Sequence, residues 1–184
     1  MRLFIAINFN DETRKKLISL GDKLQSYSKS GNFTLADNLH LILVFLDECD
    51  NKQMMTAKRV MNSVNFESFG INIAGGGYLD KGKPNLVFCA IQNDSGYSKL
   101  RQLQSELYQN LSVKGFELDK RKFWPHIILG REVVWKDIGG YLINNIDFPT
   151  TRTGVIQTDV TSIALMRSEQ INGKPAYTVI HERK

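Results

Sequence analysis

Two short apolar segments, each beginning with a histidine, constrain the fold of this chain more than any other feature. Their sequences are His-Leu-Ile-Leu at 40–43 and His-Ile-Ile-Leu at 126–129. Successive side chains of a strand point to opposite faces, so each histidine shares a face with the residue two positions later, Ile42 or Ile128. The chain has three histidines, and only His181 lies outside these segments. We therefore interpret the two segments as copies of one structural device.

The surroundings of the two segments repeat as well. A nearly continuous apolar strand at 2–8 is followed by a helix with leucines at three- and four-residue spacing, and then by His40. A second apolar strand at 86–91 is followed by another leucine-striped helix, and then by His126. This duplication predicts two sheets that face each other across a pseudo-twofold axis, with one histidine from each sheet entering the cleft. At 184 residues and 42% hydrophobic composition, residues 1–184 are expected to form one domain of two small lobes with a shared core.

Other segments predict further elements of the fold. Gly75-Gly76-Gly77 follows a predicted strand at 66–74; we interpret it as a turn or bulge, because no Gly-Lys-Ser/Thr and no evident helix follow it. The remaining expectations are a helix with Met54, Ala57, Met61 and Val64 on one face, a turn at 80–85, a short helix within 136–145, strands at 153–157, 160–166 and 176–180, and a hairpin turn at Asn172-Gly173.

Charge and cysteine content point to a cytoplasmic protein with an anionic partner. The net charge is +5, which favours RNA, a nucleotide or another phosphate ester as ligand. Cys49 and Cys89 form no Cys-x-x-Cys pair, so we expect reduced, buried thiols. The apolar run at 2–8 is shorter than a signal-peptide core or a membrane span. We therefore expect no membrane association, and the default expectation for the oligomeric state is a monomer.

A pair of facing imidazoles is suited to acid–base chemistry. One histidine can take a proton from an attacking water while the other gives a proton to a leaving oxygen, and each role typically contributes about 10² to 10⁴ in rate. A metal site is the competing use, but these strands bring no Asp, Glu, Cys or third clustered histidine. A Gly-x-Ser-x-Gly elbow is absent from the sequence, so no serine nucleophile is indicated. We expect neither a metal nor another cofactor.

The segments around both histidines resemble the signatures of the 2′-5′ RNA ligase family. These are RNA 2′,3′-cyclic phosphodiesterases of the two-histidine (2H) phosphoesterase superfamily. The matching segments are Asn38–Leu46 with Glu48, Phe123–Arg131, Arg2–Ile7 and Leu165–Ser168 with Tyr177. The resemblance implies a bilobed, duplicated α+β fold, with two antiparallel sheets across a central cleft and helices outside. It also implies hydrolysis of a terminal 2′,3′-cyclic phosphate to a 2′-phosphate, and 2′-5′ ligation by the reverse reaction.

The resemblance implies a role for each residue of the site. It makes His40 the proton donor to the leaving 3′ oxygen and His126 the base that activates water, although the two roles are open to exchange. Arg131 is the candidate for electrostatic stabilisation of the phosphate. Arg121 and Lys122, which directly precede the second segment, belong either to a solvated face or to a surface that attracts RNA. The expected partners are RNA with 2′,3′-cyclic phosphate ends, or small cyclic nucleotides.

The sequence departs from the family pattern at one position in each copy. The family motif is His-x-Thr-x, and Ile42 and Ile128 stand where the threonines bind the phosphate. Losing one hydrogen bond to a charged group costs about 1.5–3 kcal/mol. We therefore expect a metal-independent hydrolase with reduced activity, and the alternative is a catalytically impaired module that binds nucleotides or RNA ends. Replacement of the missing hydroxyls by Ser168 or Thr34 is also open.

Overall fold

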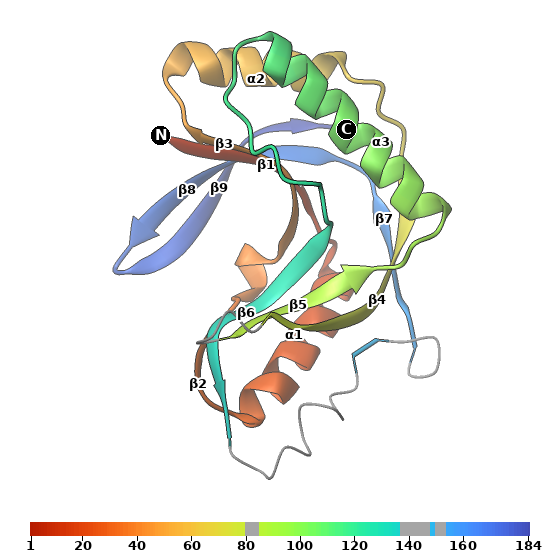
Figure 1. The fold of residues 1–184 in the computed structure, drawn as a ribbon, viewed down its shortest axis with the longest axis vertical. Coiled ribbons are helices and arrows are strands. Elements are labelled where there is room, and N and C mark those ends of the chain that lie inside the picture. Colours follow the sequence, from red (N-terminus) through yellow and green to blue (C-terminus); the bar gives the residue numbers. More distant parts are fainter. Residues whose placement is uncertain (80–84, 137–147, 150–153) are drawn as a thin grey trace.

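The computed structural model describes residues 1–79, 85–136, 148–149 and 154–184, and over these residues the chain forms two antiparallel sheets flanked by helices. Figure 1 shows α2 and α3 together over one sheet, with α3 also in contact with the other sheet, against which α1 lies. In chain order the elements are β1 (Arg2–Asn8), α1 (Asp11–Ser26), β2 (Ser28–Phe33), η1 (Ala36–Asn38), β3 (His40–Glu48), α2 (Asn51–Ser63), β4 (Phe69–Leu79), β5 (Asn85–Ile91), α3 (Ser95–Val113), β6 (His126–Trp135), β7 (Ile156–Val160), β8 (Ile163–Ile171) and β9 (Lys174–Arg183).

The sheet topology repeats around the two histidine strands. The first sheet has the strand order β3-β1-β8-β9 and the second has the order β2-β6-β5-β4-β7. His40 is the first residue of β3 and pairs with Asn8 at the end of β1. His126 is the first residue of β6 and pairs with Ala90 near the end of β5. The predicted α+β fold with two antiparallel sheets and outer helices is therefore confirmed.

The helices begin at side-chain caps and bury the apolar stripes that the sequence predicts. The Asn10 side chain accepts a hydrogen bond from the Thr13 amide at the start of α1, and Asp50 forms a reciprocal capping box with Gln53 at the start of α2. In α1 and α3 the leucine stripes are buried, while charged residues occupy the outer faces. Each helix therefore covers the apolar face of a sheet.

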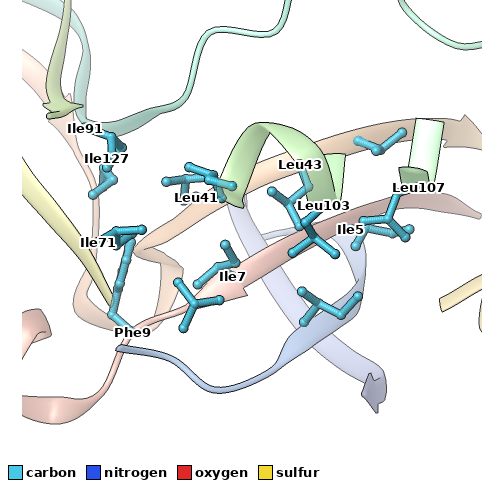
Figure 2. Packing of buried hydrophobic residues seen from close by; sticks show 14 of the residues in the cluster. Ile5, Ile7, Phe9, Leu41, Leu43, Ile71, Ile91, Leu103, Leu107 and Ile127 are labelled. Carbon is cyan, nitrogen blue, oxygen red and sulfur yellow. The ribbon is translucent and has the colours of Figure 1, made fainter. Parts of the chain in front are cut away.

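One apolar cluster connects the two sheets. Leu41 of β3 and Ile127 of β6, the residues directly after the two histidines, are both fully buried in this cluster (Figure 2). Strand alternation then turns His40 and His126 to the faces of their sheets opposite this core. On that face of the first sheet a smaller cluster is buried, and its members are Phe4, Ala6, Ala164 and Met166.

The structure also modifies several expectations. The strand predicted at 66–74 is β4, which continues to Leu79 through a bulge at the glycine triplet. Gly75 has a φ of +79°, and a Cβ at Gly76 would lie 2.6 Å from the carbonyl oxygen of Phe88, so this path of the strand needs glycine. The predicted hairpin is confirmed between β8 and β9. The turn at 80–85 falls almost wholly, and the helix within 136–145 mostly, outside the described residues.

Candidate active site

His40 packs against two aromatic rings that come from distant strands and also contact each other. The centroid of its ring is 4.9 Å from that of Phe4 on β1 and 5.0 Å from that of Tyr177 on β9, and the Tyr177 ring meets it edge-on. Phe4 is itself almost completely buried. The first catalytic candidate therefore has a mainly apolar environment.

This environment keeps His40 uncharged in the free protein. Its pKa is lowered to about 4, mainly by desolvation on burial and to a smaller extent by the nearby positive charge of Arg131. A hydrogen bond with the Asn38 backbone has the opposite effect. Because the ring must donate for such a bond to raise the pKa, the acceptor is the Asn38 carbonyl. At neutral pH the other ring nitrogen of His40 carries a lone pair.

His126 has an aromatic neighbour in the segment directly before its strand, two residues earlier in the chain. Its ring stacks on Trp124, with 4.7 Å between centroids and 25° between planes, and the Phe88 ring lies edge-on at 6.0 Å. Its Nδ1 lies 2.8 Å from the Trp124 carbonyl oxygen. A carbonyl oxygen only accepts hydrogen bonds, so Nδ1 carries the hydrogen and Nε2 is left as the acceptor of the neutral ring.

The two histidines thus use the same local device. At Trp124 the backbone carbonyl accepts the Nδ1 hydrogen of His126, which fixes the tautomer of that ring, and at Asn38 the backbone raises the pKa of His40. The strands β3 and β6 contact each other, and Arg131 of β6 acts electrostatically on His40 of β3. The structure therefore places the predicted phosphate-stabilising arginine near the first histidine, although it comes from the strand of the second.

The two isoleucines lie as the strand alternation predicts. Ile42 is half-buried against the cluster that contains Phe4 and Met166, and Ile128 is half-buried and pairs with Phe88 of β5. Thr34 lies beside β6, where its hydroxyl donates to the Ile128 carbonyl oxygen at 2.9 Å. The hydrogen of this hydroxyl is therefore directed to the backbone, which leaves Thr34 a poor substitute for the missing threonines.

In the basic segment before β6, one of the three cationic side chains forms an ion pair. The Arg121 guanidinium contacts both carboxylate oxygens of Asp119, and these bonds lower the pKa of Asp119 to about 2. Lys122 is exposed, as is Lys120. Arg121 is thus partly neutralised by its neighbour, whereas the two lysines present their charges to solvent.

Sequence reasoning missed the aromatic surroundings of the site. Phe4 and Tyr177 belong to segments that match the family, but their contacts with His40, like that of Phe88 with His126, come from strands distant in sequence. The register of β1 on β3 pairs Phe4 with Phe45 and His40 with Asn8, so the contact between the Phe4 and His40 rings depends on side-chain direction as well as on pairing. By contrast, Trp124 lies two residues before His126 in the sequence, within the segment Phe123–Arg131 that matches the family.

Neither a metal centre nor a membrane-spanning helix is found among the described residues. In that part of the chain no three His, Cys, Asp or Glu side chains gather as metal ligands. No helix there combines the length and the apolarity that crossing a bilayer requires.

Comparisons with known proteins agree with this geometry. The chain is 32% identical to an RNA 2′,3′-cyclic phosphodiesterase of Thermotoga maritima, in an alignment that covers 99% of this chain and 94% of that protein. It is 29% identical to an Archaeoglobus fulgidus protein of the same name, over 71% of this chain and 72% of the relative. The crystal structure of E. coli LigT without ligand matches with a TM-score of 0.79 and 25% identity, covering 99% and 95% of the two chains. No protein-family model matches the chain.

The fold, with a histidine at the head of the corresponding strand in each sheet, is that of a 2H phosphoesterase. Within the 2H phosphoesterases, the 32% identity with the Thermotoga protein over 99% of this chain identifies the family. The chain belongs to the family of RNA 2′,3′-cyclic phosphodiesterases.

Proposed function

We propose that this protein hydrolyses the 2′,3′-cyclic phosphate at the end of RNA, or of a small nucleotide, to a 2′-phosphate. The observation that carries the proposal is the pair of histidines, each at the first residue of the corresponding strand of its sheet. Water attacks the phosphorus, the bond from phosphorus to the 3′ oxygen breaks, and the 3′ oxygen takes up a proton. The names of the relatives support this reaction.

His126 is the base in this mechanism. Its Nδ1–H donates to the Trp124 carbonyl, so the Nε2 lone pair is available to take a proton from water. The carbonyl bond also stabilises the imidazolium that forms, because a charged donor strengthens a hydrogen bond.

His40 is the acid, and substrate binding supplies the condition for this role. With a pKa of about 4 in the free protein, charging His40 at pH 7 costs about 4 kcal/mol. A single negative charge about 4 Å away returns about 4 kcal/mol at an effective dielectric constant near 20. Binding of the phosphodiester therefore offsets the cost of protonating His40, which can then act as the proton donor.

A substrate analogue tests whether His40 is the acid and His126 the base, or the reverse. A substrate with sulfur in place of the 3′ oxygen has a leaving group that needs little protonation, so loss of the acid should matter less for it. His40→Ala should then lose much less turnover on the sulfur substrate than on the oxygen substrate, while His126→Ala should lose similar amounts on both. The opposite pattern would make His126 the acid.

Arg131 is the electrostatic partner of the phosphate. It is exposed, and its charge reaches His40, where it disfavours the imidazolium of the free protein. An anion bound between the two groups relieves this repulsion and interacts with both. Ile42 and Ile128 line the same faces as the histidines and offer methyl groups where the family motif has hydroxyls, so the phosphate depends more strongly on Arg131.

The basic segment before β6 is proposed to attract RNA. Lys120 and Lys122 are exposed and carry most of this attraction, since Arg121 is held by Asp119. Interaction with phosphates through such lysines weakens as the salt concentration rises.

The test of the proposed reaction is the identity of its product. A short RNA with a 2′,3′-cyclic phosphate end is incubated with the purified protein, and phosphorus NMR distinguishes a 2′-phosphate from a 3′-phosphate. We expect the 2′-phosphate, and slow formation of 2′-5′ linkages when a 5′-hydroxyl RNA is supplied in excess. A 3′-phosphate product would refute the assigned bond cleavage.

The presence of isoleucine at both motif positions favours one further function, that of a binding module for RNA ends. The same experiment separates the two proposals. Tight binding of the cyclic phosphate without turnover would support the binding module, whereas turnover would exclude it.

A further inference from the structure

Trp124 combines contact with a candidate catalytic residue and exposure to solvent. One face of the indole stacks on His126, while 44% of the residue is accessible. Its backbone carbonyl holds Nδ1 of His126, so the ring itself is not needed for that hydrogen bond.

The second face of the indole is not covered by the neighbouring rings. The centroid distances are 4.7 Å from Trp124 to His126, 4.7 Å from Trp124 to Phe88, and 6.0 Å from His126 to Phe88. If Phe88 lay on the face opposite His126, the last distance would approach the sum of the other two. Phe88 therefore lies at the side of the indole, where it fixes the ring without covering the free face.

We propose that this free face of Trp124 binds the nucleobase of the nucleotide that carries the cyclic phosphate. The inference rests on the proposed function, because the ribose that links base and phosphate puts the base next to the group that His126 addresses. Stacking on an aromatic side chain is available to every base. Trp124 thus makes the site selective for nucleotides over base-free cyclic phosphates, with little preference among the four bases.

The charge around Trp124 agrees with this ligand. Lys120 and Lys122 are exposed in the segment that leads to the indole. Exposed cations next to an aromatic stacking surface are the usual combination in sites for single-stranded RNA. The preceding nucleotides of the RNA then extend from Trp124 toward these lysines.

A binding experiment tests the stacking without requiring turnover. The chain has two tryptophans, so Trp135→Phe leaves Trp124 as the single tryptophan, which is excited selectively over the tyrosines. In this background adenosine 2′-phosphate should quench the fluorescence, and inorganic phosphate should not. By calorimetry, Trp124→Leu should weaken the binding of adenosine 2′-phosphate by about 5- to 150-fold and change the affinity for inorganic phosphate less than twofold. Trp124→Phe should retain most of the native affinity for adenosine 2′-phosphate.

The kinetic experiment separates stacking from mere support of His126. Trp124→Leu should raise KM for cyclic nucleotides and lower their kcat/KM far more than that of a base-free ribose 2,3-cyclic phosphate, because only the nucleotide loses a stacking partner. Equal losses on both substrates, or no loss on the nucleotide, would overturn the proposal. Failure of adenosine 2′-phosphate to bind the native protein would also overturn it. If the native protein turns over cyclic nucleotides and Trp124→Leu does so equally well, the stacking proposal is refuted and the proposed reaction stands. If neither protein shows turnover but Trp124→Leu selectively weakens the binding of adenosine 2′-phosphate, the proposed reaction is refuted and the stacking proposal stands.

Discussion

The low pKa of His40 makes the stability of the fold depend on pH, and His40→Gln tests this dependence. The folded protein binds this proton only near pH 4, whereas the unfolded chain binds it near 6.5. Between these values the unfolded state holds more protons, so the free energy of unfolding falls as the pH falls. The difference of 2.5 units, from 6.5 to about 4, corresponds to about 3 kcal/mol.

Urea denaturation at several pH values measures this contribution. The free energy of unfolding of the native protein should fall by about 3 kcal/mol more than that of His40→Gln between pH 7.5 and pH 4. Carboxylates such as Asp119 titrate in both proteins, so their effect cancels in the difference. His181→Gln is the matched control, because His181 lies on β9 and bonds to Asn62 away from the site. It should keep the His40-dependent fall.

The same reasoning predicts an effect of ligand. An anion bound near His40 favours the imidazolium, so a saturating phosphate ester should reduce the extra pH dependence of the native protein relative to His40→Gln. Proton NMR of the His40 ring should show the midpoint of its titration move upward when the ester is added. Parallel pH profiles of the native protein and His40→Gln would refute the burial argument.

Three further predictions concern the phosphate, the RNA and the absence of a metal. Ile42→Thr with Ile128→Thr should raise turnover of a 2′,3′-cyclic nucleotide at least about tenfold while lowering Tm, and no gain in a folded variant would contradict the role given to these positions. Lys122→Gln should lower the salt dependence of RNA binding by about one unit of slope in a plot of log K against log salt, and Arg121→Gln should lower it less; equal effects would refute the pairing argument. Treatment with EDTA should leave turnover unchanged, and activity restored by zinc would contradict the metal-independent mechanism.

Local sequence patterns were sufficient to predict most of the fold. The alternation in 40–43 and 126–129 predicted both histidine strands, and leucine spacing predicted α1 and α3, because burial of one face imposes these periods. The strand β2 was missed, since Ser-Lys-Ser-Gly-Asn-Phe has no apolar alternation and is ordered by its pairing with β6. Its position at the sheet edge explains why a polar sequence suffices there.

The candidate site was predictable only where its residues belong to the repeated motif. The sequence predicted His40, His126 and the faces that they share with the isoleucines. The rings of Phe4 and Tyr177 come from strands far away in sequence, so their contact with His40 depends on sheet register and strand order. The pKa of His40 follows from these contacts and was therefore beyond a local pattern.

The central claim is that His40 and His126 act together on a cyclic phosphate, and its most direct test is the turnover of a 2′,3′-cyclic nucleotide by three purified proteins. These are the native protein, His40→Ala and His126→Ala, each checked for an intact fold by circular dichroism. Each variant should lose about 10²-fold or more in turnover. A folded variant that retains native turnover in a preparation free of contaminating phosphodiesterase would contradict the two-histidine mechanism.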